Sequence, residues 1–183
     1  MCGISGFLGD FTGLELASMT AAISHRGPDG EGVWHDAKSH IGLGHRRLAI
    51  IDLTESAAQP MADASARYVV TFNGEIYNSA ELAVTHLSDR TQLNSVSSLS
   101  DTRVLVELID HYGFCKAIEM CDGMFSIAAL DIVQANLHLA VDRFGEKPLF
   151  YSNFADHFWA ASELKSALLS GIKLSVDSSA IPE

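Results

Sequence analysis

The alternation of hydrophobic and polar residues predicts many short strands with a few helices between them. Near the start, an apolar stretch at residues 2–8 ends at Gly9 and indicates a strand. From Leu14 to Ile23 the apolar side chains recur with the spacing of one helix face. Two glycines and a proline within residues 25–30 then favour a turn that ends this helix.

β-branched and aromatic residues mark the later strands. The run Tyr68–Phe72 stops at Asn73-Gly74, a dipeptide favoured where a positive φ is needed. We therefore expect this strand to deliver Asn73 into a tight turn. Short β-like runs predict further strands at residues 32–35, 41–44, 46–52, 124–131, 137–141, 149–151 and 158–161.

Helical spacing returns at residues 79–87, 102–112 and 163–169. Ser100 and Asp101 stand where the cap of the second of these helices is expected. The polar, serine-rich stretch 88–100 is predicted to be the most mobile loop.

Composition agrees with one globular domain. The chain has 183 residues, of which 48% are hydrophobic, and this is enough for a sizeable core. Neither an internal repeat nor a long Gly/Pro linker divides it, so we expect one domain over residues 1–183. The strands and the helices that flank them predict an α+β fold with two sheets sandwiched between helices.

Charge argues against two kinds of partner. Twelve Lys and Arg residues against 23 Asp and Glu residues give a net charge of −11, which repels nucleic-acid phosphates and anionic lipid. The acidic residues form no long block, so they indicate a soluble surface and not an interaction tail. The opening residues lack the basic region of a secretory signal, and no apolar run approaches the ~18 residues of a membrane-spanning helix. We expect a cytoplasmic protein that binds neither nucleic acid nor membrane.

The cysteines indicate reduced thiols. Cys2, Cys115 and Cys121 are odd in number and contain no C-x-x-C pair, which argues against a disulfide framework and a four-thiolate zinc site. Cys115 and Cys121 flank an apolar helical stretch and are expected to be small buried hydrophobic residues.

The histidines have no recognised metal-ligand spacing. His25, His35, His40 and His45 are close in sequence, but H-E-x-x-H and related patterns are absent. Glycine-rich phosphate loops are absent as well, so we expect neither a metal nor direct nucleotide binding in this domain.

Cys2 stands out by its position. A small residue after Met1 permits removal of the initiator methionine, which leaves a thiol beside a free α-amine. An α-amine titrates near neutral pH, so it can accept the thiol proton directly or through a water. Nucleophile and base would then belong to one residue. On position alone, an ordinary cysteine next to the start remains the alternative.

Short motifs along nearly the whole chain favour Cys2 as a nucleophile over Cys2 as an ordinary cysteine. They are Met1–Ile4 with Gly6-Phe7, His25–Gly30, Gly44–Leu53, Gln59–Met61, Phe72–Asn78, Ser100–Thr102, Gly123–Phe125, Asp142–Tyr151 and Ala161–Lys165. In this order the motifs resemble those of class II glutamine amidotransferases. HRGPDG, GHRRL and FNGEIYN resemble the asparagine synthetase branch more than the glucosamine-phosphate synthase or amidophosphoribosyltransferase branches.

The resemblance implies an N-terminal-nucleophile hydrolase fold, which is a four-layer αββα sandwich of antiparallel sheets with the first residue on a central strand. In that family the mature cysteine attacks the side-chain amide of glutamine and ammonia leaves. Water then hydrolyses the thioester to glutamate. The family's nucleophile aligns with Cys2.

Such a reaction needs hydrogen-bond donors for the oxyanion of the tetrahedral intermediate, a contribution commonly worth ~3 kcal/mol per donor. Asn73 and Gly74 match the family's oxyanion motif, with the side-chain amide of Asn73 as one donor and the backbone N–H of Gly74 as the other. Glycine lets that backbone approach closely. Without the family context, a hairpin turn is the simpler explanation of Asn-Gly.

Glutamine is distinguished from other amides by its zwitterionic end. Arginine pairs with a carboxylate through two parallel hydrogen bonds, and Arg47 aligns with the family's binding arginine, which leaves Arg46 as a surface or supporting residue. Asp101 matches the family's partner for the ammonium, although a plain helix cap is the alternative. Glu75 is a second candidate for the ammonium, and a solvated turn carboxylate is its alternative. Residue 103 is Arg where the family usually has Glu.

The resemblance also predicts partners. Full asparagine synthetases continue into a domain that activates aspartate with ATP, and this chain stops at residue 183 without that domain. ATP and Mg are therefore expected only there, and the ammonia acceptor would be a synthetase domain or a separate subunit. Two alternatives remain: a catalytically idle docking domain, or the glutaminase domain of a sugar or antibiotic amidotransferase. A homodimer also stays open.

Overall fold

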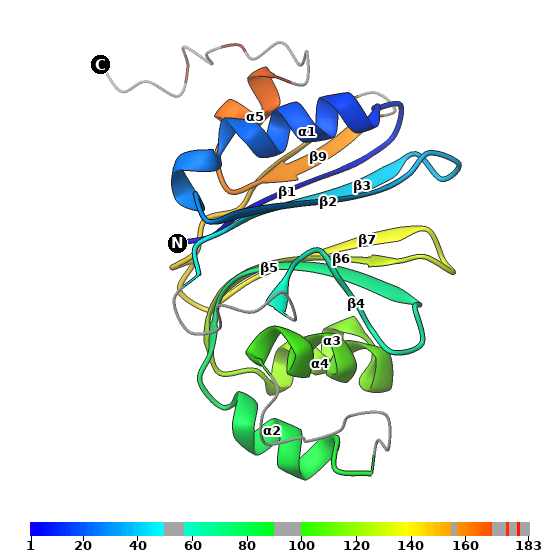
Figure 1. Ribbon diagram of the computed structural model, residues 1–183, viewed down its shortest axis with the longest axis vertical. Coiled ribbons are helices and arrows are strands. Elements are labelled where there is room, and N and C mark those ends of the chain that lie inside the picture. The colour runs from blue at the N-terminus through cyan, green and yellow to red at the C-terminus, as the bar shows by residue number, and fades with distance from the viewer. Residues whose placement is uncertain (50–56, 90–99, 155–156, 170–174, 176–178, 180–183) are drawn as a thin grey trace.

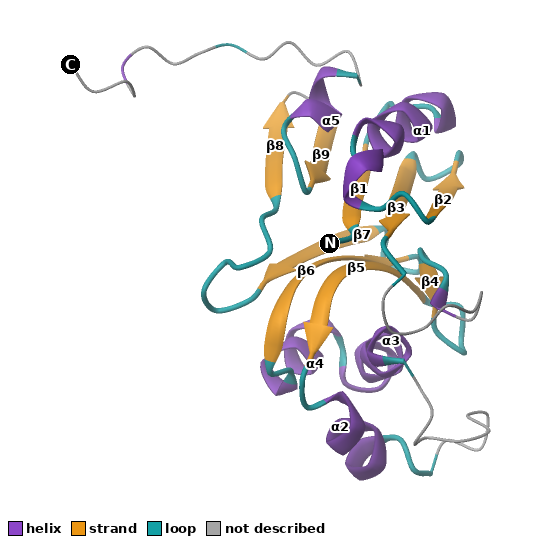
Figure 2. Ribbon diagram, turned by 60° about the vertical axis from the view of Figure 1, so that its left-hand side comes forward, coloured by secondary structure: helices purple, strands orange, loops and turns teal. Residues whose placement is uncertain are grey.

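The computed structural model describes residues 1–49, 57–89, 100–154, 157–169, 175 and 179. They form four stacked layers, with two sheets face to face between helices (Figure 1 and Figure 2). Helices α1 (Gly13–Ala22) and α5 (Lys165–Leu168) cover the outer face of one sheet. Helices α3 (Asp101–Tyr112) and α4 (Phe114–Met120) cover the other, and α2 (Ser79–His86) packs on α3.

The first sheet is antiparallel and has β1 at its centre. Its strand order is β2 (Gly30–Asp36), β3 (Ile41–Arg47), β1 (Gly3–Leu8), β9 (His157–Ala161) and β8 (Phe150–Phe154). Both faces of β1 are covered, so its residues from Gly3 to Phe7 are buried. Cys2 directly precedes this strand and therefore stands at the centre of the sheet.

The second sheet is built on one long antiparallel pair of strands. Its strand order is β4 (Met61–Ala62), β5 (Tyr68–Ile76), β6 (Gly123–Asp131) and β7 (Asn136–Val141). β5 and β6 pair along their whole length, from Tyr68 opposite Asp131 to Ile76 opposite Gly123. Valine, threonine and aromatic residues dominate β5 and favour this extended pairing.

The expectation of a tight turn at Asn73-Gly74 is wrong. β5 continues through both residues to Ile76, and the turn follows it. The glycine is required for a different reason, since a Cβ at position 74 would overlap the carbonyl oxygen of Met124 and the Cα of Phe125. Close approach of β6, and not a hairpin, explains this Asn-Gly pair.

The two longest helices begin at side-chain caps. Thr12 and Glu15 form a capping box at the start of α1. At the start of α3 the cap is Ser100, whose hydroxyl accepts a hydrogen bond from the N–H of Arg103 at 3.2 Å. The carboxylate of Asp101 is therefore not the cap and is available for other contacts.

The remaining sequence predictions agree with the structure in type more than in length. The runs expected at 41–44 and 46–52 are one strand as far as Arg47, and residues 50–56 lie outside the described part of the chain. The two-residue strand β4 was not predicted. The expectation that Cys115 and Cys121 are both buried is wrong for Cys115, which is exposed, and right for Cys121. Of the loop expected to be mobile, residues 90–99 are not described. The α+β sandwich itself is confirmed.

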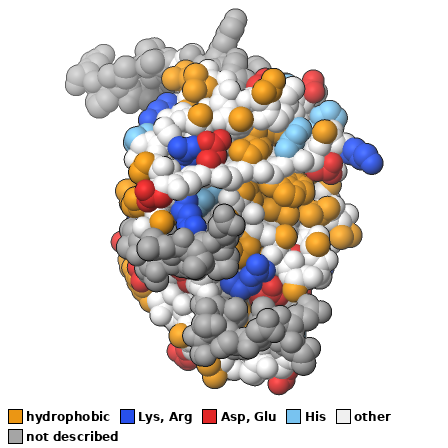
Figure 3. Space-filling view, viewed as in Figure 1, with side chains coloured by type: hydrophobic (Ala, Val, Ile, Leu, Met, Phe, Trp, Pro, Cys, Tyr) orange, Lys and Arg blue, Asp and Glu red, His pale blue; other side chains and the backbone are white. Residues whose placement is uncertain are grey.

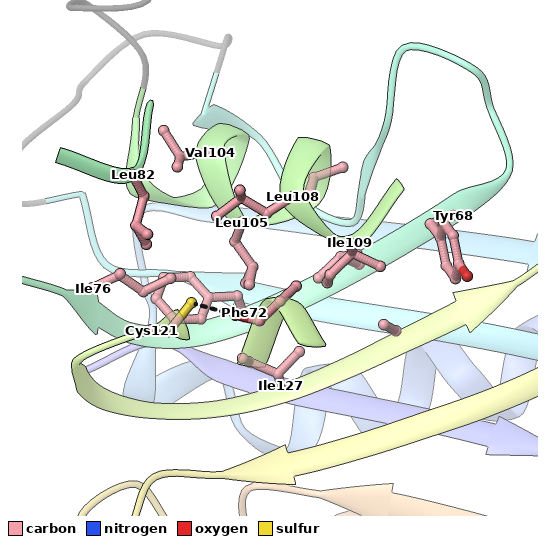
Figure 4. Close-up of a cluster of buried hydrophobic side chains, with 14 of the residues drawn as sticks. Tyr68, Phe72, Ile76, Leu82, Val104, Leu105, Leu108, Ile109, Cys121 and Ile127 are labelled. Atoms are coloured by element: carbon pink, nitrogen blue, oxygen red, sulfur yellow. Dashed lines mark hydrogen bonds between the residues drawn. The ribbon is translucent and has the colours of Figure 1, made fainter. Parts of the chain in front are cut away.

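Three apolar layers hold the sheets and helices together. The largest lies between the second sheet and α3–α4, and includes Phe72, Leu105, Ile109 and Cys121 (Figure 4). A second lies under α1 and α5. The third lies between the two sheets; its buried members are Ile4, Ile41, Leu43, Val69, Ala128 and Leu130, and further partly buried hydrophobic residues pack against them. Buried polar side chains, among them His45, Thr71 and Asn73, lie on the same strands.

The surface carries charges of both signs. Basic and acidic side chains stand next to one another on the face drawn in Figure 3. Among the residues that the structure describes, no helix has the length and apolar character needed to cross a membrane.

Candidate active site

Cys2 lies at one end of the layer between the two sheets. Side chains alternate along a strand, so Cys2 shares its face with Ile4, which packs against Val69 and Ala128 of the other sheet. The N-terminus enters between the sheets in both ribbon views (Figure 1 and Figure 2).

The thiol is held against the backbone that follows β3. The N–H of Leu48 points at the Sγ of Cys2 at 3.4 Å, and the Sγ lies 3.8 Å from the carbonyl oxygen of Leu48. Cys2 is partly buried and forms no disulfide. A partly exposed thiol beside a backbone N–H is accessible to a substrate.

Arg26, which sequence reasoning did not single out, anchors the first residues. Its Nε donates to the carbonyl oxygen of Cys2 at 3.0 Å, and one guanidinium nitrogen donates to Glu163 at 3.2 Å. The side chain of Arg26 is only 9% exposed, so this pairing is shielded from water. The arginine within the HRGPDG motif was the available signal.

The two adjacent arginines point in opposite directions. Arg46 forms an ion pair with Glu31 of the neighbouring strand. Arg47, one position further, shares the face of His45 and Leu43 and therefore turns toward the space between the sheets. The side chain of Cys2 faces the same side of the sheet. This agrees with the prediction that Arg47, and not Arg46, faces the site.

Asn73 reaches the same space from the second sheet. It shares its face with Thr71 and Val69, and Val69 packs between the sheets. Thr71 donates to the carbonyl oxygen of Gly44 on β3 at 3.3 Å, which joins the middle of β5 to the middle of β3 across the layer. Asn73 is 1% exposed, and its Nδ2 has no hydrogen-bond partner among the described residues.

The backbone of Gly74 presents a second donor. Gly74 stands opposite Phe125, whose own N–H and carbonyl are both engaged with Asp142. Gly74 and Phe125 are therefore a pair without mutual hydrogen bonds, and the N–H of Gly74 points away from β6.

Its neighbours on that edge confirm the direction. The N–H of Phe72 donates to Gln59 at 2.6 Å and that of Ile76 donates to Asp101 at 3.3 Å. The N–H of Gly74, between them, has no partner within the described ranges. Asn73 and Gly74 thus place two unused donors next to each other.

Two carboxylates lie beside this edge. Asp101 accepts from the N–H of Ile76 and, at 2.7 Å, from the N–H of Thr102. Burial raises the pKa of Asp101, the hydrogen bonds from Thr102 and Ile76 oppose this shift, and the nearby charge of Glu75 raises the pKa further. The two carboxylates therefore repel each other, which a cation between them would relieve. Arg103 does not supply that cation, since it bonds to Ala62 and Glu107.

His45 is the second residue that sequence reasoning missed. It was considered only as one of four clustered histidines, yet it is 1% exposed and faces the other sheet. Burial lowers the pKa of His45 to about 4; a hydrogen bond with the backbone of Phe72 opposes the shift and the charge of Arg47 adds to it. Its position two residues before Arg47 on a strand was the available signal.

The other clustered histidines lie apart from this site. His25 contacts Glu163 and Lys165, His40 lies near Asp10, and His35 packs edge-on against Phe7. No group of three or more His, Cys, Asp or Glu side chains is arranged to hold a metal ion in the part of the chain that the structure describes.

The fold is shared with solved structures. The chain superimposes on glutamine phosphoribosylpyrophosphate amidotransferase from B. subtilis with a TM-score of 0.72, at 20% sequence identity, over 93% of this chain and 44% of that one. At this identity the likeness shows the fold alone, and the predicted four-layer amidotransferase fold is confirmed.

Sequence comparison gives the family. The family described as glutamine amidotransferase domain matches residues 1–183, and the chain belongs to it. Asparagine synthetase (glutamine-hydrolysing) 1 of Bacillus subtilis is 36% identical over 197 residues, covering 100% of this chain and 29% of the relative. Amidase chry2 of Gibberella zeae is 35% identical over 187 residues, covering 94% and 27%. The chain thus spans less than a third of the length of these curated relatives, and the resemblance read from the motifs is confirmed.

Proposed function

We propose that this domain hydrolyses L-glutamine to L-glutamate and ammonia, with Cys2 as the nucleophile. One observation carries the proposal: a partly exposed thiol lies at the end of the layer between the sheets, where Asn73 and Gly74 present two unused hydrogen-bond donors. A nucleophile beside two donors for a developing negative charge is the arrangement that acyl transfer needs.

The reaction follows from these groups. Removal of Met1 exposes the α-amine of Cys2, which accepts the thiol proton while the sulfur attacks the side-chain carbonyl carbon of glutamine. The oxyanion of the tetrahedral intermediate accepts hydrogen bonds from Asn73 and Gly74. The carbon–nitrogen bond then breaks, the nitrogen takes the proton, and ammonia leaves. Water attacks the thioester, which releases glutamate and restores the thiol.

The surrounding charges fit the zwitterionic end of glutamine. Arg47 turns toward the space between the sheets, where its guanidinium can pair with the substrate carboxylate. Burial raises the pKa of Asp101 and the charge of Glu75 adds to this shift, and a substrate ammonium beside the two carboxylates would stabilise their negative charges. These roles of Arg47, Glu75 and Asp101 are part of the proposal.

The Cys2→Ala variant tests this function. Glutamate release from glutamine is expected to fall to the background rate, with the thermal unfolding curve unchanged because Cys2 is only partly buried. Cys115→Ala, which removes an exposed thiol on α4, is the matched control and keeps full activity. Unchanged turnover in Cys2→Ala contradicts the proposal.

Mass spectrometry of the purified protein separates this function from that of an idle docking domain. The mature enzyme begins at Cys2, because only a free α-amine can serve as its base. A purified chain that retains Met1 and releases no glutamate supports the docking alternative.

The destination of the ammonia belongs to the same proposal. We infer that a synthetase domain or subunit accepts it, with ATP and Mg bound there, because the relatives include glutamine-hydrolysing asparagine synthetases. The name of the Gibberella relative, an amidase, keeps a different acceptor as a second candidate. A cytoplasmic location accords with the reduced thiols.

A further inference from the structure

The segment that follows β9 holds the start of β1. Buried Ser162 donates its backbone N–H to the carbonyl oxygen of Ile4 at 2.9 Å, and its Oγ accepts from the N–H of Ile4 at 3.0 Å. Both backbone groups of Ile4 are therefore bonded to one residue. Glu163 comes directly after Ser162, so its side chain starts from a fixed point beside β1.

The carboxylate of Glu163 is connected to Cys2 through Arg26. Its Oε1 accepts from a guanidinium nitrogen of Arg26 at 3.2 Å, and the Nε of Arg26 donates to the carbonyl oxygen of Cys2 at 3.0 Å. The stem of the arginine lies against Gly3, where an added Cβ would stand 3.4 Å from the Cδ of Arg26. Two hydrogen bonds thus join Glu163 to the peptide group of the nucleophile.

Glu163 is ionised at neutral pH. Burial acts to raise its pKa, but the hydrogen bonds from its three basic neighbours outweigh burial and lower the pKa. Two of these neighbours, His25 and Lys165, have side chains that are about half exposed, whereas the side chain of Arg26 is almost fully buried. The bond from Arg26 is therefore a charged pair on the protein side of the carboxylate.

The position of Cys2 depends on this chain of contacts. Once Met1 is removed, Cys2 is the end of the polypeptide and is held by the contacts of its carbonyl and its thiol. The Cα of Cys2 lies in the plane of the peptide group that it shares with Gly3. A carbonyl held by Arg26, on a strand held by Ser162, therefore fixes the Cα from which the thiol and the α-amine extend.

We propose that Glu163 is a positioning residue: through Arg26, its carboxylate holds Cys2 in the place from which the sulfur attacks glutamine. The inference rests on the proposed glutamine hydrolysis. It assigns Glu163 no proton transfer and no contact with the substrate.

The expected effect of Glu163 is on catalysis and not on substrate binding. A misplaced nucleophile lowers kcat and leaves the KM for glutamine nearly unchanged. Since a displacement of about 1 Å commonly costs about 100-fold in rate, we expect kcat to fall roughly 10- to 100-fold in Glu163→Ala. Glu163→Gln keeps an amide oxygen that can accept from Arg26, so this variant is expected to recover at least about threefold of the loss.

A double-mutant cycle tests whether Glu163 acts through Arg26. Arg26→Met keeps an apolar stem against Gly3 and removes both hydrogen bonds of the arginine. We expect the double variant Arg26→Met/Glu163→Ala to have the kcat of Arg26→Met within about twofold, because the second change then has nothing left to act through. Losses that multiply in the double variant overturn the inference. If Glu163→Ala does not fold, Glu163→Gln takes its place in the cycle, since its amide leaves the buried arginine an acceptor.

Two electrophiles separate positioning from general damage. The chloroketone analogue of glutamine alkylates the thiol from the bound state and needs the sulfur in its proper place, whereas iodoacetamide reacts from solution. The thiol and the α-amine belong to one residue and move together, so the thiol keeps its base. We expect Glu163→Ala to slow the reaction with the chloroketone in parallel with kcat/KM, and the reaction of Cys2 with iodoacetamide to stay within about twofold.

Glu31→Ala is the matched control, because it also removes the carboxylate partner of an arginine, Arg46, in the same sheet. Its kcat is expected to stay within about twofold of the parent value. Parent-like kcat in both Glu163 variants overturns the inference, and so does an equal loss of the chloroketone and iodoacetamide rates. Failure of the parent protein to release glutamate overturns the proposed function instead.

Discussion

Cys2 and Cys121 show what two layers of the same fold do to a thiol. Cys121 is buried in the layer between the second sheet and α3–α4, where its Sγ donates to the carbonyl oxygen of Ala117 at 3.2 Å (Figure 4). Burial raises the pKa of Cys121 to about 12, and Asp122 contributes in the same direction. Cys2 is partly exposed and contacts a backbone N–H.

The difference comes from how each layer is filled. The layer around Cys121 contains the largest cluster of buried apolar side chains among the described residues, with Phe72, Leu105 and Ile127 in it. The layer between the sheets also holds buried polar atoms without partners among the described residues, the Nδ2 of Asn73 and the Oγ of Ser126. A thiol becomes a nucleophile where the packing leaves donors and solvent access, and stays inert where it does not.

The largest expected effect is the difference between the alkylation rates of Cys2 and Cys121 in the native protein. At pH 8 a thiol whose pKa is about 12 is ionised in only about 10⁻⁴ of the molecules, and burial restricts access as well. We expect iodoacetamide to modify Cys2 at least about 1,000 times faster than Cys121. Peptide mapping of samples quenched over time gives both rates.

Two checks belong to this measurement. Exposed Cys115 serves as an ordinary reference thiol in the same molecule. Saturating glutamine is expected to slow the labelling of Cys2 without affecting Cys115. Labelling of Cys121 at the rate of Cys115 would contradict the comparison of the two layers.

A smaller effect, on the KM for glutamine, is expected for Asp101→Asn. This variant tests whether the carboxylate of Asp101 binds the substrate ammonium. Loss of one charged hydrogen bond to the substrate ammonium should raise the KM for glutamine about tenfold with kcat nearly unchanged. The amide oxygen of asparagine still accepts from Ile76 and Thr102, so the start of α3 keeps its contacts. Steady-state kinetics of glutamate release measure the change.

The same variant has a stability signature with a defined sign. Burial raises the pKa of Asp101 above its ordinary value of 3.8. At a pH between the ordinary and the raised pKa, the folded protein therefore binds the carboxyl proton of Asp101 more tightly than the unfolded chain does. The group therefore contributes stability at low pH that is lost as the pH rises through the raised pKa.

We expect Asp101→Asn to gain stability relative to the parent between pH 4 and pH 7, measured by urea unfolding at both values. Glu119→Gln removes an exposed carboxylate on α4 and should change neither the KM nor this pH dependence. A parent protein that gains stability over Asp101→Asn as the pH rises would reverse the sign and reject the assignment.

The sequence predicted the sandwich and most strands because their signals are local. The β-branched and aromatic residues of β5 and the alternating pattern of β3 each predict a strand from the local sequence, without knowledge of the partner strand. Asn73-Gly74 misled because the same dipeptide suits a hairpin, and only the position of Phe125 on β6 shows why glycine is needed. The strand β4 has two residues, too few for any periodicity.

The site was predicted in part for the same reason. The motifs led to Cys2, Arg47 and the proposed oxyanion donors Asn73 and Gly74, and the alternation of side chains turns Cys2, Arg47 and Asn73 toward the space between the sheets. The bond from Thr71 to Gly44 joins residues of different sheets, and no local sequence pattern predicts such a contact. Sequence also left the cap of α3 undecided between Ser100 and Asp101, which the hydrogen bond of Ser100 settles.

The smallest effect on catalysis is expected from a change in the fully packed layer. Ile109 lies in that layer near the end of α3, eight residues after Asp101 on the same helix, and is 0% exposed. Ile109→Val removes one methyl group and should lower the free energy of unfolding by about 1 kcal/mol, measured by urea denaturation. We expect kcat/KM for glutamine to stay within about twofold of the parent value. In a close-packed layer, the loss of one methyl group is expected to shift the position of Asp101 very little. A tenfold loss of kcat/KM would instead mean that the packing of α3 sets the position of Asp101, and the two layers would then be one functional unit.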